Sequence, residues 1–136
     1  MAVVLPGGPV VGVRWLGRFR EFSGVDEDPL MSESVDVLST NEAFVIARYL
    51  RAGLDLIDVM EIKPDVLDGS QVAETASVLG DGEWMWREDL AHYVEKYRVG
   101  LDLEFLPSIV RWPEPVSETA MLTIVAEAVR LWQGNP

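Results

Sequence analysis

Apolar residues recur at helical spacing in two stretches in the middle of the chain. In the first, Ser39 is followed three residues later by Glu42, the pattern of a capping box, so a helix is expected to begin there. Its apolar positions form one broad stripe: Ala43, Phe44, Ala47, Tyr49 and Leu50. Gly53 stands where a C-terminal glycine would end this helix.

A second helix is expected after residue 88. The apolar positions of DLAHYVEKY recur with helical spacing at Leu90, Tyr93, Val94 and Tyr97. Acidic residues precede this stretch and basic residues follow it, an order that the helix dipole favours. By the same periodicity His92 lies opposite Leu90 and Tyr97, so it is expected on the solvent side of the helix.

Alternation of apolar and polar residues predicts strands elsewhere. The sequence VVGVRWL at residues 10–16 alternates and predicts a strand, which GRFREF would extend past Gly17. Residues 54–62 (LDLIDVMEI) are ambiguous, although their β-branched content favours a strand and Pro64 limits any continuation.

The sequence between residues 75 and 86 predicts a β-hairpin. Asp81 and Gly82 both tolerate positive φ, and as the two central residues of a tight turn they would join two short strands. On the second strand Trp84 and Trp86 would point to one face, because side chains alternate along a strand. Tryptophan is usually largely buried, so at least one of the two is expected in the core. The expected core comprises Trp84, Leu90, Tyr93, Val94, Phe44 and Leu50.

The last third of the chain predicts further helices. Asp102 would cap a short one through Phe105, Ile109 and Val110, which Pro107 would limit or kink. Ser117 would cap the last one. The apolar face of that last helix comprises Met121, Leu122, Val125, Val129 and Trp132. Together the patterns predict one α+β domain over residues 1–136, with N-terminal strands and a central β-hairpin packed against about four helices.

The charge of the chain indicates which kinds of partner it could bind. There are 23 acidic residues against 11 Lys and Arg, a formal net charge of -12. The acids are clustered: residues 21–47 contain no base, and residues 52–86 contain only Lys63. Such a field repels nucleic acids and anionic membranes and attracts basic proteins. Solubility alone is the alternative explanation of the same charge.

Catalytic and metal-binding patterns are missing from the sequence. There is no cysteine, and His92 is the only histidine, so neither a thiolate site nor a zinc cluster is expected. The spacing of Asp65, Asp68 and Gly69 does not match a calcium loop and is typical of an ordinary exposed turn. We therefore expect no metal, no cofactor and no enzyme activity.

The N-terminal and apolar patterns bear on location. The first sixteen residues lack a basic n-region, and Pro and Gly interrupt them, so they predict no signal peptide. No apolar run reaches the roughly 18 residues of a membrane span. The absence of cysteine fits a reducing compartment, and a cytoplasmic protein is the expectation.

One stretch, GDGEWMWREDLAHYVEKY followed by LDLEFLPSI, resembles a pattern found in small and mostly uncharacterised bacterial proteins. The matching positions, over roughly residues 48–110, are Tyr49, Leu50, Gly53, Asp81, Gly82, Trp84, Trp86, Asp89, Leu90, Tyr93, Val94 and Phe105. The pattern has an aromatic residue where His92 stands and a proline where Asp102 stands. Some proteins of this kind resemble immunity or antitoxin-like partners of secreted toxins. The resemblance implies a folding pattern and transfers no functional residue.

Two functions remain open on these grounds, beside a structural domain with no separate site. The first is a non-enzymatic interaction protein, similar to an immunity protein that neutralises a basic bacterial toxin domain, acting as a monomer or weak dimer. The second is a small enzyme or ligand-binding domain that uses carboxylates and a tryptophan-lined pocket. For the first, the loop between residues 23 and 34 and its continuation supply the expected partner-binding residues: Asp26, Glu27, Asp28, Glu33 and Asp36.

Overall fold

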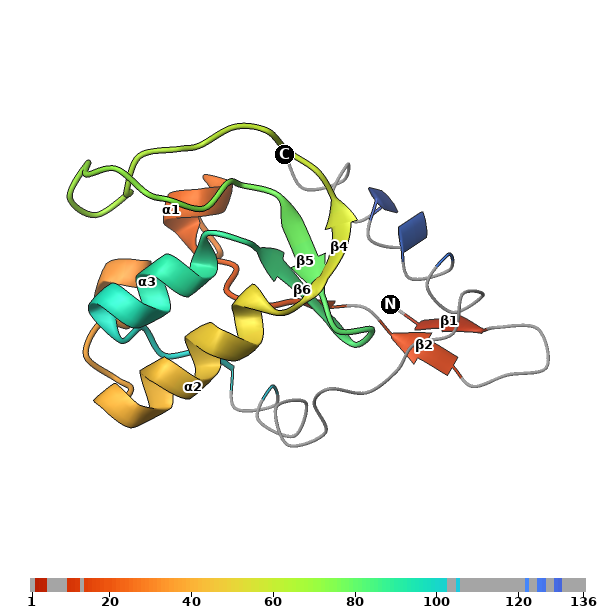
Figure 1. Cartoon of the computed structure of the whole chain (residues 1–136), viewed down its shortest axis with the longest axis horizontal. Helices are drawn as coiled ribbons and strands as arrows, with labels where there is room; N and C mark the ends of the chain where they lie inside the picture. Colours follow the sequence, from red (N-terminus) through yellow and green to blue (C-terminus); the bar gives the residue numbers. More distant parts are fainter. Residues whose placement is uncertain are drawn as a thin grey trace.

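The computed structural model describes residues 14–102, the backbone of residues 2–4 and 10–12, and positions 105, 122, 125, 126, 129 and 130. Over these residues the fold is α+β, as predicted, with a four-stranded mixed sheet and three α-helices (Figure 1). Three α-helices have both of their ends within the described residues, where the sequence predicted about four helices. Described positions from 122 to 130 are helical, and the rest of the predicted last helix lies outside the described residues.

The central sheet joins segments that are distant in sequence. Its strands occur in the spatial order β3 (Arg14–Trp15), β6 (Trp84–Arg87), β5 (Val78–Gly80) and β4 (Leu54–Ile57). β3 pairs with β6 in parallel, and the other two pairings are antiparallel. A separate antiparallel ladder joins β1 (Ala2–Val4) to β2 (Val10–Gly12).

The strand β3 does not continue past Gly17. The backbone of Gly17 adopts a φ of 69°, and helix α1 (Arg20–Ser23) follows it. The extension through GRFREF was therefore wrong, because the glycine turns the chain away from the sheet. A 3-10 turn, η1 (Met31–Glu33), follows α1.

Two longer helices, α2 (Thr40–Arg51) and α3 (Leu90–Tyr97), pack against each other and against one face of the sheet. The predicted capping box is present at the start of α2. Ser39 Oγ accepts from the backbone N–H of Glu42 at 3.1 Å, and Glu42 Oε1 accepts from the backbone N–H of Ser39 at 2.8 Å. These bonds satisfy two of the donors that a helix N-terminus leaves free, and they fix where α2 begins.

The helices and the sheet enclose the main core. Trp84 and Trp86 both belong to it, while Met85 points to the opposite face of the sheet, as the strand pattern predicts. Phe44 is the error in the predicted core, because its side chain is 62% exposed. The buried side of α2 runs through positions 43, 46, 47 and 50, so Ile46 occupies the inward position instead.

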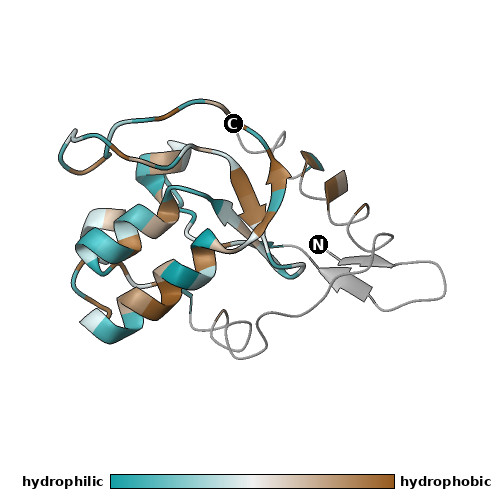
Figure 2. Ribbon diagram, viewed as in Figure 1, coloured by the Kyte–Doolittle hydropathy of each residue, from teal (hydrophilic) through white to brown (hydrophobic). Residues whose placement is uncertain are grey.

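The second face of the sheet is also apolar. Leu56, Val78 and Met85 form a smaller cluster, and Val125 of the C-terminal helical segment packs against it. Figure 2 shows apolar colour along β5 and alternating apolar and hydrophilic colour around α2. The sheet is thus apolar on both faces, whereas α2 is amphipathic. Leu122, which was expected on the apolar face of the last helix, is exposed.

The hairpin turn differs by one residue from the prediction. Backbone N–H of Asp81 donates to the carbonyl of Trp84 at 3.1 Å, so Gly82 and Glu83 are the central residues of the turn. Only Gly82 has a positive φ, at 95°. Asp81 instead acts through its side chain, since Oδ1 accepts from two backbone amides of the turn and Oδ2 accepts from the Tyr49 hydroxyl at 2.6 Å.

The tryptophan of β6 explains Gly53. Trp86 Nε1 donates to the carbonyl of Leu50 at 3.0 Å, so the indole lies against the end of α2. A Cβ on Gly53 would stand 2.7 Å from that ring. Gly53 has no positive φ, and Ala52 is the C-cap residue, so the glycine permits close approach rather than a left-handed helix end.

Candidate functional site

The acidic segment, residues 24–36, connects α1 to α2. Asp26, Glu27 and Glu33 are exposed, and no described side chain pairs with them. Asp28 lies inside the segment, where its Oδ2 accepts from Arg18 Nε at 2.9 Å and from Ser23 Oγ at 2.5 Å. The structure therefore gives the predicted binding residues two different environments.

Asp36 closes the acidic segment and has a partner of its own. Its Oδ1 accepts from Arg98 at 2.8 Å in an exposed ion pair. An exposed pair of this kind stabilises a fold by only about 0–1 kcal/mol. Asp36 therefore remains accessible, although its charge is partly compensated.

The acidic segment, which the sequence predicted as a loop, is held in place by a core contact and by hydrogen bonds. Met31 is fully buried in the main core. The carboxylate of Glu21 accepts from the backbone amides of Met31 and Ser32 at 2.7 and 3.0 Å. Burial raises the pKa of Glu21, but these backbone bonds outweigh it and hold the pKa below its usual value. A charged side chain of α1 thus fixes the segment in place.

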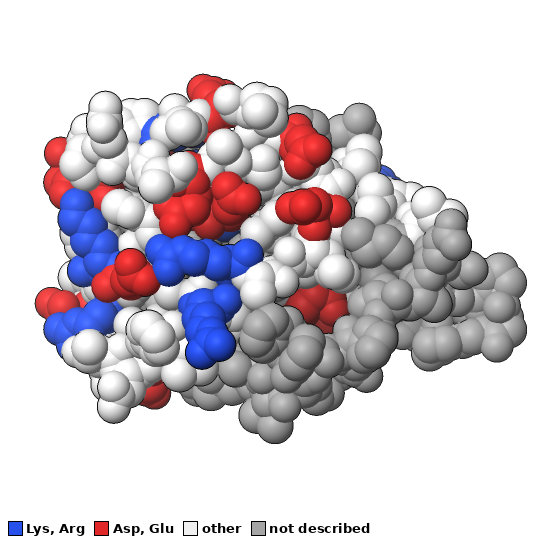
Figure 3. Space-filling view, viewed as in Figure 1, with Lys and Arg blue, Asp and Glu red and all other residues white. Residues whose placement is uncertain are grey.

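Most basic side chains of the described residues are neutralised within the chain. The ion pairs of these Lys and Arg side chains include Arg14–Glu83, Arg18–Asp28, Arg51–Glu74, Arg51–Glu95, Lys63–Glu61, Arg87–Asp89, Lys96–Asp65, Lys96–Asp68 and Arg98–Asp36. In Figure 3 most of the blue side chains on the left lie beside red ones, whereas red side chains to their right stand among white atoms. The uncompensated charge at the described surface is therefore mainly acidic.

A long connection, residues 58–77, joins β4 to β5 and is called the arm below. Neighbouring antiparallel strands need only about 2–5 residues to connect them, so the sheet does not require an arm of this length. Two contacts hold its base together. Ser77 Oγ bridges the backbone N–H and carbonyl of Val59, at 2.9 and 3.1 Å, and backbone N–H of Ala76 donates to the carbonyl of Glu61 at 3.0 Å.

The tip of the arm is anchored on α3 through Asp65. Its buried Oδ2 lies 2.7 Å from His92 Nε2 and accepts from the Tyr97 hydroxyl at 3.0 Å. Its Oδ1 accepts from two backbone amides of its own turn, those of Leu67 and Asp68, at 2.8 and 3.1 Å. One carboxylate thus closes the turn and binds the helix at the same time.

Asp65 and His92 correct two expectations. Asp65 does not lie in an ordinary exposed turn, since its side chain is buried. The side chain of His92 is only 16% exposed and does not face open solvent. Burial raises the pKa of Asp65, but the bonds from His92, the two amides and Tyr97 outweigh it and hold the pKa below its usual value.

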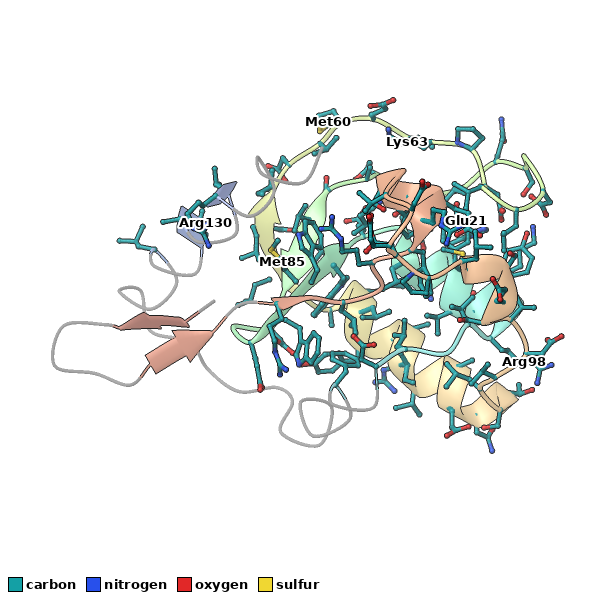
Figure 4. All side chains as sticks on the ribbon, turned by 180° about the vertical axis from the view of Figure 1, so that it is seen from behind. Glu21, Met60, Lys63, Met85, Arg98 and Arg130 are labelled. Atoms are coloured by element: carbon teal, nitrogen blue, oxygen red, sulfur yellow. The ribbon has the colours of Figure 1, made fainter. Side chains whose placement is uncertain are left out.

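Tyr93 brings the arm and α1 together. Its hydroxyl accepts from the backbone N–H of Val66 at 2.9 Å, and its ring centroid lies 5.3 Å from that of Phe22 in α1. Burial raises the pKa of Tyr93 to about 12, so the hydroxyl is neutral at physiological pH. Figure 4 shows the arm, marked by Met60 and Lys63, beside α1 and Glu21. The arm and the start of the acidic segment therefore occupy the same side of the molecule.

Two apolar side chains of the arm are more than half exposed. Met60 is 90% exposed and Ile62 is 59% exposed, and we call these two residues the apolar pair. The sequence contained them in the ambiguous stretch 54–62, but its strand pattern gave no sign that β4 ends at Ile57. Their position outside the sheet was therefore missed.

Replacing Asp65 with alanine is expected to release the tip of the arm. The change removes the acceptor of His92, Tyr97 and two backbone amides, and each lost bond of this kind costs about 0.5–1.5 kcal/mol. We expect faster amide hydrogen exchange across residues 58–77 and little change in α2. Asp68→Ala is the matched control, because Asp68 is exposed and its bond to Lys96 lies at the surface. Equal exchange in the two variants would contradict the anchoring role of Asp65.

The tryptophan pair does not form an exposed binding surface. Trp84 and Trp86 are both buried, and the ring centroid of Phe105 lies 6.0 Å from each of them. Phe105 also meets Tyr49 at 5.3 Å between ring centroids. The aromatic and aliphatic residues of the sequence pattern thus lie in the core, consistent with a folding role.

The comparisons with known proteins give no family. No protein-family model matches the chain, and neither the curated proteins nor the solved structures include a match. Among the described residues no group of three His, Cys, Asp or Glu side chains could hold a metal ion. The same part of the chain contains no helix that is both long and apolar enough to cross a membrane.

Proposed function

We propose that this chain is a non-enzymatic interaction protein that binds a basic protein partner, such as the catalytic domain of a bacterial toxin. The observation that supports this function is the unequal pairing of charge in the described residues. Bases are mostly neutralised by internal ion pairs, whereas Asp26, Glu27 and Glu33 are exposed without a partner.

The order of the acidic segment adds to this support. A segment fixed by Glu21 and Met31 holds its carboxylates in place before a partner arrives. A fixed field of one sign attracts an opposite charge and raises the rate of association. Asp28 has a different role in this proposal, because its carboxylate holds Arg18 and Ser23 and keeps the segment folded.

The direct test is binding of the purified chain to a panel of purified basic toxin domains, measured by calorimetry. A large secreted toxin encoded beside this chain would identify the first domain to try. Failure of the chain to bind any basic domain, with binding to acidic ones, would contradict the proposal.

Neutralising the exposed acids is expected to slow association with such a domain. In the variant Asp26→Asn/Glu27→Gln/Glu33→Gln we expect the association rate to fall by about tenfold at low salt, because electrostatic steering is lost. The salt dependence of the rate should flatten as well. Stopped-flow fluorescence at two salt concentrations measures both effects. Folding should change little, since surface substitutions are usually within about 0.5 kcal/mol each.

A second variant serves as comparison. Asp55→Asn/Asp58→Asn/Glu61→Gln removes the same charge from the start of the other acidic run, and we expect it to slow association less. If only this second variant were slower, binding by the acidic segment would be wrong while the interaction function would stand. If neither variant differed from the unmodified chain, the charge would serve solubility alone.

A further inference from the structure

The arm is an addition to the fold that the sheet does not need. It contains twenty residues and connects two strands that lie side by side, β4 and β5. Connections of this length without regular secondary structure are usually functional or disordered. The anchoring of this arm at Val59, Glu61 and Asp65 favours a functional role over a disordered one.

The apolar pair is held in solvent by that anchored backbone. Met60 lies between the two residues whose backbone atoms are bound to Ser77 and Ala76, and Ile62 follows directly. Single exposed apolar residues are common on protein surfaces. Here the two side chains are close in sequence, on an ordered segment, and largely exposed. Because the backbone that carries them is already held in place, binding a partner through them would cost little ordering entropy.

Carboxylates border the apolar pair. Asp58 and Glu61 are exposed neighbours in sequence, and the one base of this stretch, Lys63, lies 3.9 Å from Glu61. The acidic segment follows α1, which lies beside the tip of the arm, because Tyr93 contacts both Val66 of the arm and Phe22 of α1. A surface of this composition complements a segment that combines basic and apolar side chains.

We propose that the apolar pair of the arm is the docking point for a basic, apolar-containing segment of the protein partner. This inference rests on the proposed function and deepens it by assigning separate tasks to two surfaces. The acidic segment steers the partner and sets the association rate. Met60 and Ile62 become buried in the complex and slow its dissociation, as apolar anchors at the centre of interfaces do. Methionine suits this task because its flexible side chain adapts to the shape of a partner.

The test uses two synthetic peptides of equal charge and the full chain. One peptide alternates lysine with leucine (KLKLKLK), and the other alternates lysine with serine (KSKSKSK). Calorimetry is expected to show that the unmodified chain binds the leucine peptide at least about tenfold more tightly, since burial of apolar side chains contributes to affinity only there.

Two variants show where the leucine side chains bind. Met60→Gln/Ile62→Gln is expected to abolish the difference between the peptides, leaving the affinity for the serine peptide unchanged. Phe44→Gln/Val45→Gln is the matched control, because it replaces two exposed apolar residues of α2, which lies at the opposite edge of Figure 1 from the arm. The control should retain the tenfold preference.

The remaining outcomes separate this inference from the proposed function. Equal binding of the two peptides, or an equal effect of the two variants, would overturn docking on the arm while leaving a basic partner in place. If neither peptide bound, the basic partner itself would be refuted, and the docking point with it. Sedimentation that showed a dimer, lost only in Met60→Gln/Ile62→Gln, would assign the pair to a second copy of this chain and overturn the inference.

Discussion

Replacing Leu90 with alanine is expected to lower the free energy of unfolding by about 2–5 kcal/mol. Leu90 is fully buried at the start of α3, and its side chain fills the space beside Gly17 so closely that a Cβ there would lie 2.6 Å from it. Removing it leaves a cavity between α3 and the end of β3. The midpoint and slope of urea unfolding, followed by tryptophan fluorescence, measure the loss.

Phe44→Ala is the control for this large-to-small change. The two positions were equally good core candidates by sequence, but Phe44 is mostly exposed. We expect its replacement to change stability by no more than about 0.5 kcal/mol. A similar loss in both variants would show that the orientation of α2 described here is wrong.

The second large effect is expected from replacing Arg87 with leucine. This change should lower the free energy of unfolding by about 3–5 kcal/mol near neutral pH. Asp89 is completely buried, and Arg87 binds both of its carboxylate oxygens, at 2.9 and 2.6 Å. The guanidinium carbon of Arg87 also lies 4.0 Å from the ring centroid of Phe22. Without the arginine, the carboxylate would be a buried charge with no counterion.

The pH dependence of Arg87→Leu follows from the same burial. Burial raises the pKa of Asp89 even in the presence of Arg87, so in the folded protein this group takes up a proton more readily than in the unfolded chain. Because its folded-state pKa is raised, the contribution of Asp89 to stability is greatest below the ordinary pKa of about 3.9 and falls as pH rises through the folded-state pKa. The gap between the variant and the unmodified chain should therefore narrow on acidification.

Two further variants test this explanation. Arg51→Leu removes an arginine whose pairs with Glu74 and Glu95 are largely at the surface, and we expect it to cost about 1 kcal/mol or less. Adding Asp89→Asn to Arg87→Leu should recover part of the lost stability at neutral pH. A loss in Arg87→Leu that is the same at pH 4 and pH 7 would argue against a buried charge as its cause.

The features that the sequence predicted well depend on neighbours in the chain. The capping box of Ser39 and Glu42 spans three residues, and the opposite faces of Trp84 and Met85 follow from strand geometry. The error at Phe44 has a local cause as well. Apolar residues cover more than half of the circumference of α2, so periodicity alone did not determine which edge turns inward.

The arm and its anchor could not be predicted because their contacts join distant residues. Asp65 meets His92 across 27 positions, and no pattern in either stretch indicates the pairing. The periodicity of its own helix predicted that His92 faces solvent, but the arm covers that face of the helix. In the same way, the sequence does not distinguish Asp28 from Asp26 as a partner-binding residue. In the structure the carboxylate of Asp28 accepts hydrogen bonds from Arg18 and Ser23.

The parallel pairing of β3 with β6 has a consequence for how this protein is made. Arg14 pairs with Trp84, and Trp15 pairs with Met85. The strand that pairs with the first strand of the central sheet therefore follows it by about seventy residues in the sequence. As the chain leaves the ribosome, Leu16 and Phe19 emerge early, yet the main core to which they belong also needs residues of β6 and α3, which follow much later. Contacts of such long sequence separation form slowly because a large loop must close first. The main core can therefore be completed only after α3 has been made, so its completion is a late event in synthesis.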